Sequence, residues 1–207
     1  MRSPSLLIDS AKPLVLDTSV AINLTATEDA DRILRALPSR LIVADEVVSE
    51  LESGRNRGRE NAEQVQGLIE SSLVETAAMG SMALDHFEKL VAGSARGTLG
   101  DGEAATIAIA LEIDGIPLLD DHKACGICDK RYPKLSYGCS IDIFAHAEVG
   151  RALGTSGLAL AVFNALMKAR MRVLPQHERW VVNLIGPERA AQCGSLSRSA
   201  RSSFDIP

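Results

Sequence analysis

The chain alternates short apolar runs with longer stretches of helical periodicity, and this alternation limits the folds open to it. Apolar runs at 14–16, 41–44 and 116–119 have the length of buried strands, and 73–76 is expected to form a further short strand. The stretches between them repeat apolar residues at the spacing of a helix face. Strands that alternate with helices form a parallel sheet with helices on both faces. We therefore predict a three-layer α/β/α fold around a central parallel sheet.

Helical spacing also predicts where individual elements begin and end. Thr25 and Glu28 have capping-box spacing, so a helix is expected to follow them as far as Pro38. Asp45 is expected to cap the helix after the second strand. Further helices are predicted around 65–69, 84–91, 103–115, 141–148, 158–169 and 177–184, with a short helix near Lys123 and a strand at 135–137.

The length of 207 residues suits one domain with a helical extension. We predict an N-terminal extension at 1–13, a core at 14–150 and a C-terminal helical extension of the same domain at 151–193. The tail at 194–207 is rich in serine and arginine and is predicted to be disordered. A composition of 46% hydrophobic, 24% charged and 3% aromatic residues is that of a globular protein.

Charge and hydropathy narrow the class of protein further. A net charge of -5 argues against nucleic-acid binding through a uniformly basic surface, although it is compatible with a nuclease whose acids bind metal. No window of about 18 residues is uninterruptedly apolar, and the first residues lack the apolar region of a secretory signal. We expect a cytoplasmic protein that spans no membrane, with its four cysteines reduced.

Acidic residues recur where the predicted strands end. Asp17 directly follows the first strand, and Asp120 and Asp121 follow the strand at 116–119. Glu50 and Glu103 lie in helices expected to border the same edge of the sheet. The carboxyl ends of parallel strands share one edge, so these acids can converge. For Asp17 alone, capping of a helix that starts near Val20 is an equally good reading.

Converging carboxylates repel one another unless a cation binds between them. Oxygen-only ligands select hard ions, which makes Mg2+ or Mn2+ the expected metal. Such an ion polarises a phosphate and lowers the pKa of a bound water, and an acid such as Asp17 can orient that water. The predicted reaction is phosphodiester hydrolysis.

A glycine-rich stretch after the helix of Glu50 holds Arg55, Arg57 and Arg59. Because these arginines alternate with small or polar residues, we read a basic loop that contacts a polyanion. An ordinary solvated loop explains the same residues equally well.

Four segments carry the acids: LVLDTSVAINL, VADEVVSELESG, LGDGEAATIAIALE and IPLLDDHKA. In this order and at these spacings they resemble the four acidic motifs of PIN-domain proteins. The chain looks like a VapC-like ribonuclease of the branch with a GEA motif and a DD pair. The resemblance extends from Leu14 to near Ile185.

The resemblance implies a Mg2+- or Mn2+-dependent endoribonuclease, commonly the toxin of a toxin-antitoxin pair and often a homodimer. Its partners would be RNA and an antitoxin protein. The resemblance implies that Asp17, Glu50, Glu103 and Asp121 are the catalytic acids and that they bind the metal. Asp101 would be an additional ligand, and Asp121 is preferred to Asp120 as the fourth acid. Ser19 would support the metal site beside Asp17.

The segment after the last acids departs from that family, which usually has a basic helix there. Cys125, Cys128 and Cys139, with His122 nearby, supply four potential zinc ligands, but small buried residues in a packed helix are the favoured reading. Trp180 and His146 are expected to be core or interface residues. Asp142 and Ser140 are weaker candidates for support of the metal.

Two other functions compete with the nuclease. A phosphatase that forms an aspartyl-phosphate usually has a second acid two residues after the first, and Ser19 stands at that position. The second competing function is that of a PIN module that binds RNA or a partner protein without cutting RNA. Acids at all four motif positions count against it.

Overall fold

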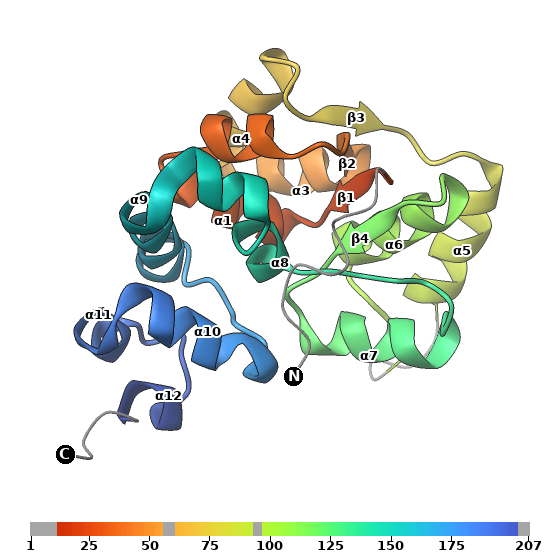
Figure 1. Ribbon diagram of the computed structural model, residues 1–207. Helices are drawn as coiled ribbons and strands as arrows, with labels where there is room; N and C mark the ends of the chain where they lie inside the picture. Colours follow the sequence, from red (N-terminus) through yellow and green to blue (C-terminus); the bar gives the residue numbers. More distant parts are fainter. Residues whose placement is uncertain (1–11, 56–60, 93–96, 203–207) are drawn as a thin grey trace.

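A computed structural model describes residues 12–55, 61–92 and 97–202. Four strands form one parallel sheet in the order β3-β2-β1-β4 (Figure 1). Their bounds are Leu14–Leu16 for β1, Leu41–Ala44 for β2, Glu75–Ala77 for β3 and Ile116–Leu118 for β4. The predicted three-layer α/β/α class is confirmed, while the third strand begins two residues later than predicted.

The first strand, β1, lies inside the sheet, with Leu14 paired to Leu41 of β2 and Leu16 to Leu118 of β4. Its residues are almost completely buried, which explains why the run is apolar without alternation. From β1 the chain steps outward through β2 to β3 and then returns to the other side of β1 as β4. The order of strands therefore reverses between β1 and β4, where open α/β sheets usually bind ligands.

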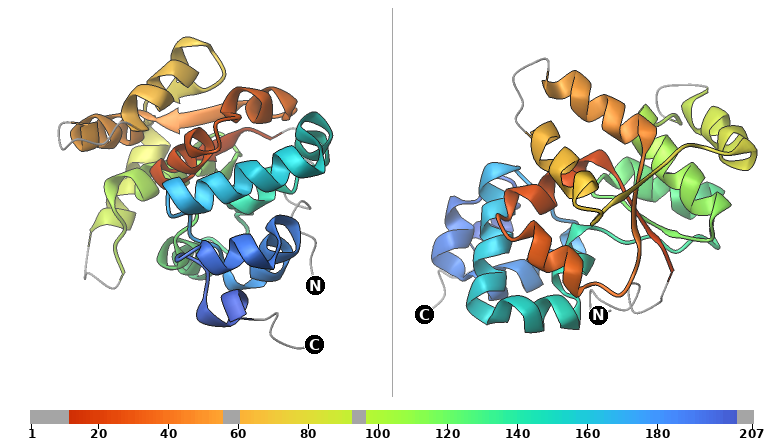
Figure 2. Two further views of the ribbon diagram at one scale, coloured as in Figure 1. Left: turned by 90° about the vertical axis from the view of Figure 1, so that its left-hand side faces the viewer. Right: turned by 90° about the horizontal axis from the view of Figure 1, so that it is seen from above.

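Helices cover the sheet on two sides (Figures 1 and 2). Helix α6 packs across β1, β2 and β4, and α5 lies against α6, whereas α9 packs against α1, α2 and α10 at the other side of the molecule. Their bounds are α1 Thr18–Ala26, α2 Ala30–Ala36, α3 Asp45–Arg55, α4 Asn61–Glu70, α5 Ser81–Val91, α6 Asp101–Glu112, α7 His122–Arg131, α8 Ser140–Phe144, α9 Ala147–Lys168, α10 Pro175–Ile185, α11 Pro187–Gln192 and α12 Arg198–Ser202.

Two local predictions were wrong. Thr25 does not open a helix: it lies in the last turn of α1, where its hydroxyl donates to the carbonyl of Ile22, and α2 starts only at Ala30. The strand expected at 135–137 is absent from the described chain, and a single bridge joins Gly138 to Leu118 instead.

The tail from Gly194 was predicted to be disordered, which is wrong for α12. The amide and hydroxyl of Ser197 both donate to the Glu178 carboxylate on α10, at 2.8 and 2.7 Å. These two hydrogen bonds hold the start of α12 against α10 of the C-terminal extension. Residues 203–207 lie outside the described part of the chain.

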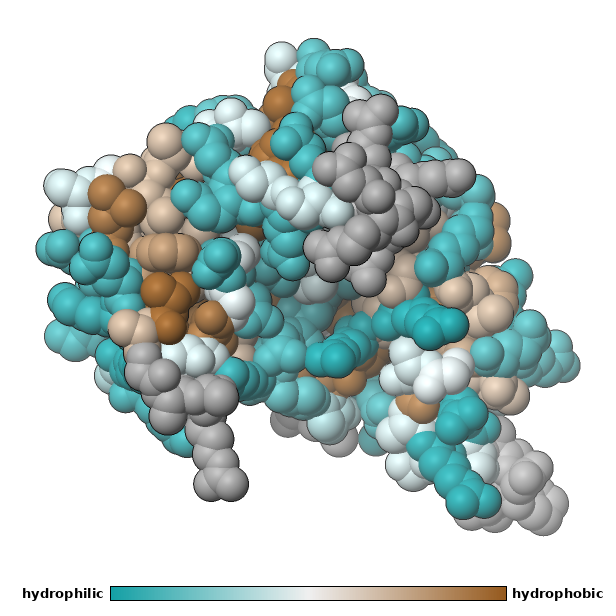
Figure 3. All heavy atoms as spheres, turned by 180° about the vertical axis from the view of Figure 1, so that it is seen from behind, coloured by the Kyte–Doolittle hydropathy of each residue, from teal (hydrophilic) through white to brown (hydrophobic). Residues whose placement is uncertain are grey.

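Helix α9 is the one described helix long and apolar enough to meet the criterion for crossing a membrane. It is broken at Gly154, whose φ of 67° is left-handed, and it packs against α1, α2, α8 and α10. Buried core helices pass the same test of length and composition. On the face seen from behind, hydrophobic residues form patches among hydrophilic ones (Figure 3).

Candidate functional site

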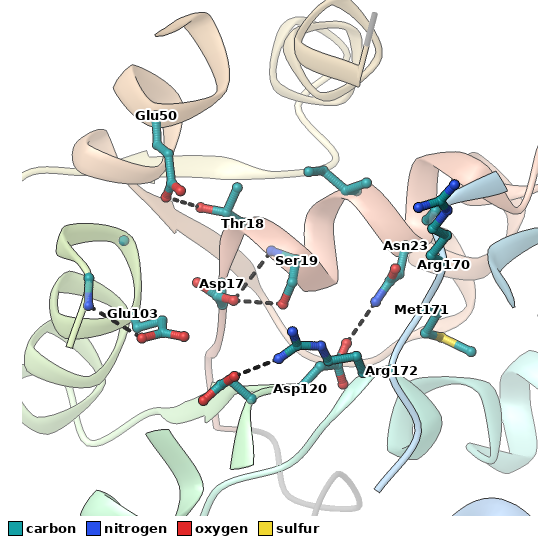
Figure 4. Close-up of a pocket in the computed structure, with 15 residues that line it drawn as sticks. Asp17, Thr18, Ser19, Asn23, Glu50, Glu103, Asp120, Arg170, Met171 and Arg172 are labelled. Atoms are coloured by element: carbon teal, nitrogen blue, oxygen red, sulfur yellow. Dashed lines mark hydrogen bonds and ion pairs between the residues drawn. The ribbon is translucent and has the colours of Figure 1, made fainter. Parts of the chain in front are cut away.

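A pocket of about 430 Å³ opens at the carboxyl ends of β1 and β4, where the order of strands reverses (Figure 4). Acids from separate elements line it together with a basic segment that follows α9. The charged residues that line the pocket are Asp17, Glu50, Glu103, Asp120, Asp121, Arg170 and Arg172. The acids of all four sequence segments therefore meet in one place.

Asp17 follows β1 directly, and its amide donates to the carbonyl of Leu118 on β4 at 3.3 Å. Its carboxylate also caps α1, with Oδ2 accepting from the amide of Ser19 at 3.3 Å and from the Ser19 hydroxyl at 2.7 Å. The same carboxylate therefore caps the helix and lines the pocket. Burial raises the pKa of Asp17, the bonds from Ser19 oppose that shift, and the charge of Glu50 adds to it.

Glu50 reaches the pocket from α3, and its Oε2 accepts a hydrogen bond from the Thr18 hydroxyl at 2.7 Å. The bond depends on Gly102 of α6: a Cβ there would lie 2.5 Å from Glu50 Oε2 and 2.9 Å from Thr18 Oγ1. Gly102 therefore lets α6 approach α3 closely enough for Glu50 to join the other acids. Neither Thr18 nor Gly102 was predicted from the sequence to be part of the site.

Glu103 lies in the first turn of α6, where its Oε2 accepts from the amide of Gly100 at 3.4 Å. Burial, followed by the charges of Asp17 and Asp121, raises its pKa from 4.5 to about 7. Asp101, predicted as an additional ligand, does not line this pocket. It lines a neighbouring hollow with Asp45, Glu46, Ser49, Glu50 and Ser53.

The two acids after β4 have different surroundings. Asp120 is buried, with Oδ1 accepting from the Ser140 amide at 2.9 Å and Oδ2 from the Ser140 hydroxyl and the Asn23 side chain, at 2.5 and 2.7 Å. Its pKa rises to about 6, chiefly through burial. Asp121 caps α7 through Oδ1, which accepts from the amide of Lys123 at 2.7 Å. Ser140, a weak candidate in the sequence analysis, thus supports Asp120 directly.

The remaining oxygen of Asp121, Oδ2, forms an ion pair with Arg172 Nη1 at 2.8 Å. Arg172 arrives there because α9 ends in a reversal: Arg170 takes a left-handed φ of 52°, and the amide of Met171 donates to the carbonyl of Ala165 at 3.2 Å. The buried Met171 side chain secures this turn. Neither arginine was predicted from the sequence, although Lys168, Arg170 and Arg172 form an alternating basic series.

The donor set of the pocket fits a hard divalent cation. Glu50 Oε1 and Glu103 Oε1 accept no hydrogen bond from the described residues, and the pKa of Asp17, Glu103 and Asp120 is raised by burial among other acids. Buried carboxylates gain stability as anions when a cation replaces the lost water. Oxygen donors of this kind suit Mg2+ or Mn2+.

Other predicted site residues lie elsewhere. Arg55 is the last residue of α3, and Arg57 and Arg59 are outside the described residues, so the basic loop stays a prediction. Cys125 and Cys128 are buried in α7 as free thiols, and His122 is exposed. In residues 12–55, 61–92 and 97–202, no potential metal group joins this pair with Cys139 or His122, which contradicts that zinc set.

The fold and the pocket agree with a comparison to known families. A family model described as a PIN domain matches residues 13–185. No curated protein and no solved structure matches the chain significantly.

The contact between Gly102 and Glu50 leads to a first prediction. Gly102→Ala should displace the flexible ends of Glu50 and Thr18, leave the fold intact and weaken Mg2+ binding by about tenfold, because one carboxylate leaves the pocket. Isothermal titration calorimetry with Mg2+ measures this loss. Gly100→Ala is the matched control, since its Cβ would meet open space. Equal affinities for the two variants would contradict the role of Gly102.

The raised pKa of Glu103 leads to a second prediction. A group whose pKa rises from 4.5 to about 7 on folding stabilises the metal-free protein below pH 4.5, and this contribution is lost as pH rises towards 7. The Tm without metal should therefore fall across this range, and added Mg2+ should raise the Tm more at pH 7.5 than at pH 5. Differential scanning fluorimetry of the wild type, Glu103→Gln and the exposed-site control Glu52→Gln tests this. A Mg2+ effect independent of pH would refute it.

Proposed function

Because the chain belongs to the PIN-domain family, we propose that it is a metal-dependent endoribonuclease that hydrolyses RNA phosphodiester bonds with Mg2+ or Mn2+. The observation that carries the proposal is the convergence of acids from four segments in one pocket at the reversal of the sheet. Burial, followed by the charges of neighbouring acids, raises the pKa of Glu103, and burial and the charge of Glu50 raise that of Asp17, so both carboxylates are disfavoured as anions unless a cation lies beside them. Cation binding explains their arrangement.

In this proposal Asp17, Glu50, Glu103 and the Asp120/Asp121 pair hold the metal. Bound there, Mg2+ or Mn2+ would supply Lewis-acid chemistry, namely polarisation of a phosphate and a lower pKa for a nearby water. The protein supplies the orientation: Ser19 fixes the Asp17 carboxylate, Thr18 fixes that of Glu50, and Asn23 with Ser140 fixes that of Asp120. These three acids are thus held by neutral donors, which add no positive charge beside them.

Arg172 and Arg170 are proposed to bind an RNA phosphate at the pocket. The Arg172 side chain is 72% exposed, so it can leave Asp121 and turn to an incoming phosphate. Guanidinium groups bind phosphate oxygens in pairs of parallel hydrogen bonds. A protein of net charge -5 needs such a local cation beside its acids to receive RNA. Arg55, Arg57 and Arg59 are proposed to extend this contact along the RNA.

The ion pair between Arg172 and Asp121 also favours a second candidate, a PIN module that binds RNA or a partner protein and cuts poorly. A guanidinium that stays on Asp121 would occupy one carboxylate that the metal needs. RNA cleavage by the purified chain separates the two functions. The toxin role, an antitoxin partner, a homodimer and a cytoplasmic location are further proposals, which rest on the resemblance to VapC-like ribonucleases.

Asp17→Asn provides the direct test of the nuclease. The substitution keeps the size and the helix cap but removes the charge, so Mg2+- or Mn2+-dependent cleavage of a fluorescently labelled RNA should fall by roughly a hundredfold or more. Circular dichroism checks that the fold is retained. Asp101→Asn is the control, because Asp101 lies outside the pocket, and its activity should stay near that of the wild type. Cleavage that persists in EDTA would refute the metal mechanism.

Arg172→Ala separates RNA binding from metal binding. Loss of one phosphate contact should weaken RNA binding about tenfold and should reduce the slope of log binding constant against log salt concentration by about one. Mg2+ should bind as tightly or more tightly, because Asp121 loses its ion pair. Fluorescence anisotropy at several salt concentrations measures the first effect. Arg179→Ala, at an exposed position on α10, is the control. RNA binding unchanged by Arg172→Ala would place the phosphate elsewhere.

A further inference from the structure

A second group of potential metal ligands lies outside the acidic pocket. Cys139 directly precedes α8, Asp142 lies in that helix, and His177 is in the first turn of α10. One ligand atom of each residue lies within 4.8 Å of those of the other two. All three are buried, and none lines the acidic pocket. The group therefore joins the end of the core to the C-terminal extension.

The imidazole of His177 faces Cys139 and Asp142 where α10 meets the start of α8. The residue is only 9% exposed, and its ring makes no hydrogen bond or ion pair to the residues the structure describes. The negative charge of Asp142 acts on the ring and opposes the lowering of its pKa by burial. A ring nitrogen of His177 is therefore available as a metal ligand beside the other two side chains.

The surroundings prepare these three side chains for a metal. Burial lowers the pKa of His177, which keeps its ring neutral with a free lone pair. Asp142 is held in place because its Oδ2 accepts from the amide of Cys139 at 2.8 Å. Burial beside Asp142 raises the pKa of Cys139, so the thiol stays protonated in the absence of metal and would release its proton on binding.

We propose that Cys139, Asp142 and His177 bind a zinc ion that ties α10 to the start of α8. Thiolate, imidazole and carboxylate together are the ligands zinc takes in tetrahedral sites, and a thiolate disfavours Mg2+. Three protein ligands leave the fourth position to water. The zinc site is distinct from the acidic pocket in both residues and ligand chemistry.

The position of the zinc site gives it a structural role next to the pocket. Ser140, which follows Cys139, donates two hydrogen bonds to Asp120, and the segment with Arg170 and Arg172 runs between α9 and α10. An ion that holds Cys139 and His177 would therefore hold both Ser140, which bonds Asp120, and the end of the segment that carries Arg170 and Arg172.

Metal content tests the zinc site without any RNA. The full chain is loaded with zinc, freed of excess ion on a gel-filtration column and analysed by inductively coupled plasma mass spectrometry, with Asp17→Asn as the background that weakens the acidic pocket. We expect one ion per chain in this background, and a loss of more than about tenfold when Cys139→Ser or His177→Gln is added. Cys128→Ser, which removes another buried thiol, should keep the zinc.

Cobalt gives a second readout that does not depend on unstable variants. With Co2+, the wild type should show a thiolate-to-cobalt charge-transfer band and the absorption of a tetrahedral site, and Cys128→Ser should keep both. Absence of the band in the wild type, its loss in Cys128→Ser, or equal zinc content in His177→Gln and its parent would overturn the proposal. Since no outcome uses RNA cleavage, failure of the zinc site and failure of the nuclease are distinguishable.

Discussion

The parallel pairing of β1 with β4 is the constraint on which the site depends. Leu16 lies opposite Leu118, and the next amide, that of Asp17, still donates to the carbonyl of Leu118. This register places the residues that follow both strands at one edge, although they lie far apart in the chain. A shift of one residue would turn Asp17 into the core and an apolar side chain into the pocket, because successive residues of a strand point to opposite faces.

The acids brought together by this register are held by neutral donors rather than by lysine or arginine, Asp121 excepted. Ser19, Thr18, Asn23 and Ser140 each donate to one carboxylate and add no charge. Hydrogen bonds fix the direction of a carboxylate, whereas an ion pair would also neutralise it. The pocket therefore keeps the negative potential that attracts a divalent cation. Burial, followed by the charges of Asp17 and Asp121, raises the pKa of Glu103 despite the opposing charge of Lys123.

The sequence predicted the parts of the site that follow from strand ends. Asp17 and the Asp120/Asp121 pair were predictable because each follows a continuous apolar run, and such runs end at one edge of a parallel sheet. Gly102, Asn23 and Arg172 were not, because their roles depend on how close two helices approach or on where a C-terminal segment crosses the pocket. Thr25 misled for a related reason: its hydroxyl bonds a carbonyl of its own helix, and spacing alone does not reveal this.

The cysteines also show that spacing in the sequence does not predict which side chains meet in the fold. Cys125 and Cys128 have the spacing of a metal pair, yet in α7 they face the core among apolar residues. Cys139 finds its potential co-ligands at Asp142, one helical turn later, and at His177, on a helix of the C-terminal extension. That extension also carries Arg172 to Asp121. The residues after 150 therefore do more than cover the core, because the segment with Arg170 and Arg172 lines one side of the acidic pocket.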